Sequence, residues 1–254
     1  MTLLTALRSE LLKTKRTASF YLTLIGAAVG PVIYLVNILT DETEINSAGK
    51  DPLNGLFKIL SEMNGMALFP LFIILICTLL PQIEYRNNAW KQLFASPQTK
   101  ANVFLAKFMN VHFLMLGFIV ATHVFMFITI LIIGVIKPNL NLFAQPLNVK
   151  LLLANAANAY ILLLAFCAIQ FWLGMRSKNF ILPIGIGVTL WLTGTILPLY
   201  NSPNLAYYFP YSFHVVLVSA KFKPALTQTA LISLGMAVMF VSAGIVDLRR
   251  KAVR

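Results

Sequence analysis

The chain has 254 residues, of which 59% are hydrophobic and 11% are charged, and its mean hydropathy is +0.80. Soluble domains carry about 25% charged residues, so this composition excludes a single soluble core and indicates an integral membrane protein. The formal net charge is +12. In a soluble protein this charge would suggest a nucleic-acid partner, but here the basic residues lie between apolar runs, and we expect no nucleic-acid partner.

Six apolar runs are long enough to cross a bilayer, for which about 20 residues are needed. The runs cover roughly residues 18–39, 63–83, 108–136, 151–175, 179–199 and 225–246. None of the 28 charged residues falls inside them, and a charge at mid-bilayer costs about 3 kcal/mol. The predicted fold class is therefore an all-α integral membrane protein, with residues 1–254 forming one six-span domain.

The distribution of basic residues predicts the orientation of the spans. With the N-terminus placed inside, 14 of the 20 Lys and Arg residues fall in cytoplasmic segments, and positive residues favour that side of the membrane. Both termini are therefore expected in the cytoplasm. The basic segments are also expected to attract anionic membrane lipid.

The residues before the first span predict an amphipathic helix within residues 1–17. Leu3, Leu4, Leu7 and Leu11 share one face of this helix, and basic residues lie elsewhere on it. A helix of this kind is typical of the membrane interface. It would serve as a membrane anchor that leads into the first span. It would alternatively contact a cytoplasmic partner as well, and the two roles are compatible.

A sizeable cytoplasmic loop is predicted between the second and third spans, at residues 84–107. Its first part can be helical, and Pro97 is expected to end that helix, because proline disfavours helical geometry in the residue before it. A second helical stretch is then expected to lead into the third span. Trp90 fits either an anchor at the lipid head groups or the aromatic anchor of a protein contact.

The last outside loop is predicted at residues 200–224 and is rich in aromatic residues. An aromatic belt at the membrane surface explains this enrichment. Within the loop, residues 213–220 are apolar but too few to span a bilayer. They predict a re-entrant or interfacial segment before the last span.

Polar residues are sparse inside the predicted spans. Asn155 and Asn158 are three residues apart and so share one helix face. Gln170 follows in the same span, and His123 lies in the third span. These four residues are candidates for a translocation path, but hydrogen bonds between neighbouring helices explain them equally well.

The chain carries no motif for catalysis. It has no G-x-x-x-x-G-K-[ST] phosphate-binding loop, and its three histidines have no acidic or cysteine neighbour at metal-ligand spacing. The two cysteines lie singly in apolar runs, where packing is their usual role. We therefore expect no enzyme activity, no metal and no cofactor in this chain. A stand-alone membrane enzyme is disfavoured because no predicted span contains a carboxylate.

Together, the basic N-terminal helix, the six spans and the loop resemble the permease subunit of ABC-2 type ABC transporters. The most specific part is residues 84–107, where an acidic residue ends the second span. A basic and aromatic helix, a Ser-Pro break and a lysine before the third span, Lys107, follow. The letters EYRNN from residue 84 and LKTKR from residue 12 are most similar to the lantibiotic-immunity and bacitracin-export branch.

The resemblance implies a multi-pass subunit of an exporter in the bacterial cytoplasmic membrane. Its cargo would be an amphipathic or hydrophobic compound such as a peptide antibiotic. ATP and Mg would be bound by a separate P-loop ATPase subunit in two copies, and a second permease, identical or related, would complete the pore. The implied contacts with the ATPase are Glu84, Arg86, Trp90, Lys91, Phe94 and Pro97. The alternative is a membrane anchor or sensor of an ABC-linked secretion or motility complex that transports nothing.

Overall fold

In a computed structural model, the described residues are 2–40, 51–87, 90, 98–144, 146–200 and 203–250. These residues form helices and connecting turns, with no β-strand among them. Five of the helices are long and apolar enough to cross a membrane, and one bent pair raises the number to as many as six. The predicted all-α membrane fold is therefore confirmed.

The first part of the chain ends in a long, nearly continuous helical stretch. Its helices are α1 (Leu3–Thr14), α2 (Ala18–Thr40), α4 (Pro52–Met63), the π-helix η1 (Asn64–Leu68) and α5 (Phe69–Arg86). The last three follow one another without a break over 35 residues. The sequence predicted a span that begins near residue 63. The helix begins earlier, at Pro52, because Lys58 and Glu62 lie on its polar side and do not interrupt it.

The middle part contains the longest helix and a bent one. Its elements are α7 (Lys100–Ile136), the short 3-10 turns η2 (Pro138–Leu140) and η3 (Leu142–Ala144), α8 (Val149–Leu162) and α9 (Leu164–Arg176). At 1.5 Å per residue, the 37 residues of α7 extend about 55 Å, well beyond the roughly 30 Å of a hydrocarbon core. The predicted fourth span is the pair α8 and α9, bent by 42° at a break near Leu163.

The last part contains two long helices with several short ones between them. Its elements are α10 (Ile181–Tyr200), α11 (Leu205–Tyr208), η4 (Pro210–Ser212), α12 (Phe213–Val218), η5 (Lys223–Ala225) and α13 (Leu226–Arg250). The short helix α12 packs against η1, α8 and α13. Tyr211 and Phe213 were expected in an aromatic belt, but both are almost fully buried. They fill the space between helices instead of facing lipid.

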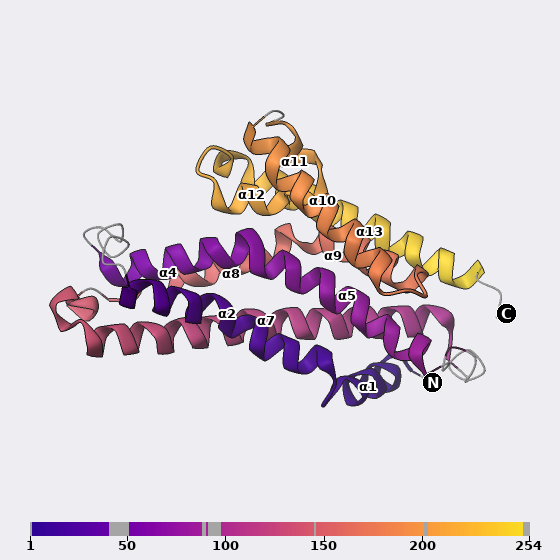
Figure 1. The fold of residues 1–254 in the computed structure, drawn as a ribbon. Helices are drawn as coiled ribbons and strands as arrows, with labels where there is room; N and C mark the ends of the chain where they lie inside the picture. The colour runs from indigo at the N-terminus through magenta and orange to yellow at the C-terminus, as the bar shows by residue number, and fades with distance from the viewer. Residues whose placement is uncertain are drawn as a thin grey trace.

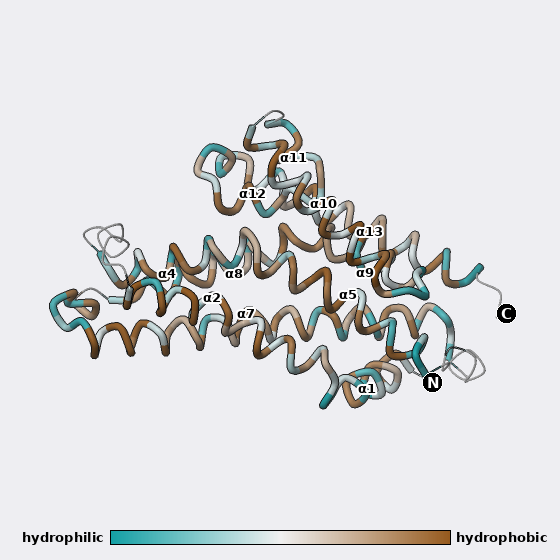
Figure 2. The backbone as a smooth tube through the Cα atoms, viewed as in Figure 1, coloured by the Kyte–Doolittle hydropathy of each residue, from teal (hydrophilic) through white to brown (hydrophobic). Residues whose placement is uncertain are grey.

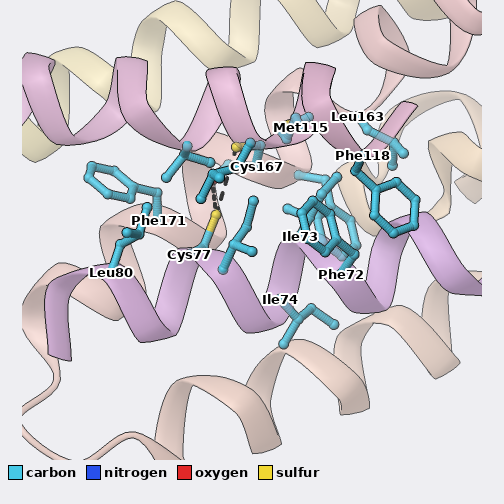
Figure 3. Packing of buried hydrophobic residues seen from close by; sticks show 14 of the residues in the cluster. Phe72, Ile73, Ile74, Cys77, Leu80, Met115, Phe118, Leu163, Cys167 and Phe171 are labelled. Atoms are coloured by element: carbon cyan, nitrogen blue, oxygen red, sulfur yellow. Dashed lines mark hydrogen bonds between the residues drawn. The ribbon is translucent and has the colours of Figure 1, made fainter. Parts of the chain in front are cut away.

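The helix α5 is the centre of the bundle. In the most apolar window of the continuous stretch Pro52–Arg86, which ends in α5, 61% of the residues are buried, against 22–33% in the other four span candidates. Figure 3 shows Phe72, Ile73 and Cys77 of α5 against Met115 and Phe118 of α7, with the α9 side chains beside them. The thiols of Cys77 and Cys167 are both free, with their sulfur atoms 3.8 Å apart. They pack in this core, as their apolar surroundings predicted.

The outer helices leave large apolar side chains uncovered. The exposed residues include Ile25 and Val32 of α2 and Val120 and Val124 of α7. Figure 2, coloured by residue hydropathy, shows hydrophobic residues along most of both helices. A water-soluble protein rarely exposes so continuous an apolar surface. These faces are suited to lipid.

Figure 1 shows that α1, the end of α5, the start of α7 and the end of α13 lie at one end of the bundle. The helix α4, the end of α7 and the start of α8 lie at the other end. The two polar features described below lie toward opposite ends.

Candidate functional site

Four charged side chains meet where α1, α5 and α7 converge: Glu10, Lys13, Glu84 and Lys107. We refer to them as the charge cluster. The Lys107 ammonium nitrogen is 2.6 Å from a carboxylate oxygen of Glu10 and 2.6 Å from one of Glu84. The Lys13 ammonium nitrogen is 2.8 Å from Glu10 and 3.2 Å from Glu84. Two positive and two negative groups therefore balance one another within hydrogen-bond distance.

The charge cluster is largely shielded from solvent. Only 6% of Glu10, 2% of Glu84 and 1% of Lys107 is exposed. Burying an ion costs several kcal/mol unless charged partners and hydrogen bonds compensate it. Lys107 has two such partners, and they come from two different helices. The cluster therefore holds α1, α5 and α7 together in one specific arrangement.

Hydrogen bonds extend the cluster along the contact between α1 and α7. The Asn110 amide donates to the Thr14 hydroxyl at 2.6 Å and to the Glu10 backbone carbonyl at 3.4 Å. The Thr14 hydroxyl in turn donates to the same carbonyl at 3.0 Å. These bonds join an amide of α7 to a side chain and a backbone carbonyl in the last turns of α1. They place the last turn of α1 firmly on α7.

The pKa values of the two α1 residues reflect this pairing. Burial raises the pKa of the Glu10 carboxyl, but the Lys107 and Lys13 ammonium groups outweigh burial, and the pKa lies below its ordinary value of 4.5. Burial lowers the pKa of Lys13, but Glu10 and Glu84 outweigh it, and that pKa lies above its ordinary value of 10.5. Both groups therefore stay charged at neutral pH.

Trp90 lies beside the charge cluster. Its ring centroid is 5.2 Å from that of Tyr85, and the Lys107 ammonium nitrogen is 6.0 Å from its centre. The Tyr85 hydroxyl donates to the backbone carbonyl of Met175 at the end of α9 at 2.8 Å. Trp90 is half-buried, so part of the indole remains accessible next to the end of α5.

The other residues predicted to contact an ATPase lie in different surroundings. Arg86 is exposed at the end of α5. The sequence also placed Glu84 among these contacts. Its carboxylate is buried in the charge cluster against Lys107, and its contact with a partner stays a prediction. Lys91, Phe94 and Pro97 lie outside the described residues.

Sequence reasoning missed Glu10 as part of this site. Its only signal was that Glu10 is the sole acidic residue in residues 1–40, three positions before Lys13. The Glu84 and Lys107 ends of the loop were recognised from the sequence. Their direct contact was not, because it depends on how α5 and α7 pack.

The candidate path residues separate into two groups. His123 and Asn155 both line a cavity of about 330 Å³ between the η1 region, α7 and α8. Asn158 does not line this cavity. Gln170 is fully buried elsewhere, where it donates to the Pro183 carbonyl at 2.8 Å and accepts from the Tyr211 hydroxyl at 2.9 Å. Gln170 therefore ties helices together, which was the alternative explanation for it.

The chain was compared with models of known protein families. A family model described as ABC-2 family transporter protein matches residues 6–194. This range includes most of α1, all four residues of the charge cluster and both cavity-lining residues named above. No curated protein matches the chain.

Proposed function

Because the chain belongs to the ABC-2 family of transporter proteins, we propose that it is the permease subunit of a bacterial exporter. Family membership and the long apolar helices make it a multi-pass protein of the bacterial cell membrane. In this family the membrane component is not itself the ATPase. We propose that it moves an amphipathic or hydrophobic compound outward, for example a peptide antibiotic, and that a separate ATPase supplies the energy.

The observation that carries the coupling part of this proposal is the charge cluster at the two ends of the segment between α5 and α7. Glu84 lies in the last turn of α5, Lys107 lies in the third turn of α7, and 2.6 Å separates their charged atoms. An ATPase that docks on this segment, against Arg86 and Trp90, would displace both helices together. Glu10 would draw α1 along, since separating a buried ion from its partners costs about 3–5 kcal/mol.

The proposed energy transfer needs the ATPase to distinguish two arrangements of the permease. A partner shifts such an equilibrium only by the difference between its affinities for the two states. We propose that two ATPase copies close on ATP and favour one arrangement of the docked segments. A second permease, identical or related, would complete the pore, and the end of the bundle that holds the charge cluster would face the cytoplasm.

Transport by inverted membrane vesicles tests this function. Vesicles containing the chain and its ATPase would be given ATP and a panel of fluorescent amphipathic peptides. We expect accumulation of at least one peptide, and none with an ATPase whose phosphate-binding lysine is replaced. ATP hydrolysis without accumulation of any peptide would contradict transport and support the alternative, an anchor or sensor of an ABC-linked complex.

A further inference from the structure

The cavity between the η1 region, α7 and α8 has the features of a built binding site. Its volume of about 330 Å³ is at the lower end of the range for small-molecule pockets. It lies far from the charge cluster: 15 residues of α7 separate Lys107 from Thr122 in its wall, about 22 Å along a helix. The two sites are therefore distinct, although α7 contributes to both.

Two buried polar side chains in the cavity wall have oxygen atoms without a partner. Asn64 is 6% exposed and Thr122 is 3% exposed, and both line the cavity. Among the described residues, nothing forms a hydrogen bond with Asn64 Oδ1 or with Thr122 Oγ1. A buried polar atom left in this way costs free energy. A polar group in the cavity would recover that cost.

The π-helix η1 places one of these side chains. Asn64 is the first residue of η1. Its side-chain nitrogen Nδ2 donates to the Leu60 backbone carbonyl at 2.9 Å, so the side-chain oxygen Oδ1 remains for another group. The next residue is Gly65, where an added Cβ would lie only 3.1 Å from the Leu217 side chain. Single π-helical turns occur frequently at functional sites. The first two residues of this π-helical turn, Asn64 and Gly65, both line the cavity.

The cavity wall also contains charged side chains and an apolar part. Lys58, Glu62 and Lys223 all line the cavity, and among the described residues none of the three takes part in an ion pair. Cations therefore outnumber anions by two to one. The apolar part of the wall is formed by Phe69, Phe118, Met126 and Leu217.

We propose that this cavity binds the anionic head group of an amphiphile. Lys58 and Lys223 would hold the anion, Asn64 and Thr122 would form hydrogen bonds with polar groups next to it, and the first part of the apolar tail would contact Phe118 and its neighbours. The volume suits a head group with a short piece of tail. As a statement about cargo this inference rests on the proposed function, but the binding itself requires no ATPase.

Photolabelling tests the binding directly. The full chain would be placed in phosphatidylcholine nanodiscs without an ATPase. It would be exposed to a dodecyl phosphate whose tail carries a diazirine, and separately to a dodecyltrimethylammonium probe with the same tail. We expect saturable labelling of α7 and α8 peptides by the phosphate probe, at concentrations about tenfold lower than any labelling by the cationic probe.

Matched variants separate binding in the cavity from adsorption to the surface. Lys223→Gln is expected to weaken labelling by about tenfold, which corresponds to about 1.4 kcal/mol. Lys150→Gln, at an exposed position outside the cavity, should leave labelling unchanged. Thr122→Val removes one hydroxyl and should weaken binding, and Ala156→Phe should abolish it by filling the space without changing charge.

Adding phosphatidylglycerol to the nanodiscs distinguishes the source of the amphiphile. Competition by this lipid would identify a membrane lipid as the natural occupant, and its failure to compete would favour a transported anionic compound. Equal labelling by the two probes, or labelling that survives Ala156→Phe, would overturn the proposal. Loss of peptide transport in vesicles with intact labelling would contradict only the proposed function.

Discussion

Lys107 is the most deeply buried charged residue of the charge cluster, and its charge is compensated by carboxylates from two other helices. The Lys107→Met change keeps an unbranched side chain but leaves Glu10 and Glu84 buried with one fewer cation. We expect a loss of about 3–5 kcal/mol, seen as a lower apparent Tm in detergent. The exposed Lys150→Met serves as the control. Equal Tm values for both variants would show that the cluster contributes nothing to stability.

The pH dependence of stability follows from Glu10. Its folded pKa lies below the ordinary value of 4.5, so its contribution is fully present above pH 4.5 and is lost as pH falls through the folded pKa. Lys13 affects stability at alkaline pH, because its folded pKa is raised above 10.5. Its contribution is present below pH 10.5 and is lost as pH rises through the folded value.

Thermal unfolding between pH 7 and pH 3 measures the Glu10 contribution. We expect the Tm of the wild-type chain to fall more steeply below pH 4.5 than that of Glu10→Gln, which has no carboxyl to protonate at this position. Parallel curves for the two proteins would contradict the assignment. Only the slope is compared, since the variant starts from a lower Tm.

At the scale of helices, α9 lies against α5 at a point where no side chain fits between them. A Cβ added at Gly174 of α9 would collide with the Cys77 backbone carbonyl oxygen in α5. Gly174→Ala is therefore expected to lower the apparent Tm. The control is Gly235→Ala in α13, where an added Cβ meets nothing within 4 Å.

The two glycine changes are expected to differ in their effect on stability. Alanine favours a helix over glycine by about 1 kcal/mol, so Gly235→Ala should be neutral or stabilising. Thermal unfolding of both variants in the same detergent provides the comparison. A stabilised Gly174→Ala protein would show that α5 and α9 do not pack as closely as described.

Apolar content predicted which segments are helical but not where each helix begins. The first span was placed at residues 18–39, and α2 covers Ala18–Thr40. The third was placed at 108–136, whereas α7 begins at Lys100. Apolar content ended the span at Lys107 because of its charge, but the helical stretch predicted to lead into the third span is found as the first turns of α7. The partners of Lys107 on other helices compensate its charge inside the helix. The bend near Leu163 falls within an apolar stretch, so hydropathy gave no indication of it.

Some residues of the candidate sites were also predicted from the sequence, and others were not. The resemblance of the loop sequence implied Trp90 and Arg86 as contacts of a partner, and that role stays a prediction. Asn64 and Thr122 were not found, since a single amide or hydroxyl in a span is unremarkable until its oxygen is seen to lack a partner in a cavity. Two of the four candidate path residues, His123 and Asn155, line that cavity, and their role in transport stays a prediction.

At the scale of the whole molecule, two continuous helical segments connect the charge cluster to the cavity. One contains Asn64 and Glu84, 20 residues or about 30 Å apart along a helix, and the other contains Thr122 and Lys107. A displacement at one end of a packed helix reaches the other end, because close-packed interiors transmit strain. The charge cluster and the cavity therefore share these two helical segments.

The most direct test of the proposed function is purification of the chain from native membranes in mild detergent, with identification of the bound proteins. Wild type would be compared with Trp90→Ala and with Trp191→Ala, which removes an indole of α10 from the interior instead. We predict that a P-loop ATPase is recovered with the wild type and with Trp191→Ala. Its recovery should fall by about tenfold or more with Trp90→Ala, as expected for an aromatic anchor of a contact. Purification without any ATPase, or ATPase binding that is unchanged by Trp90→Ala, would contradict a docking site beside the charge cluster.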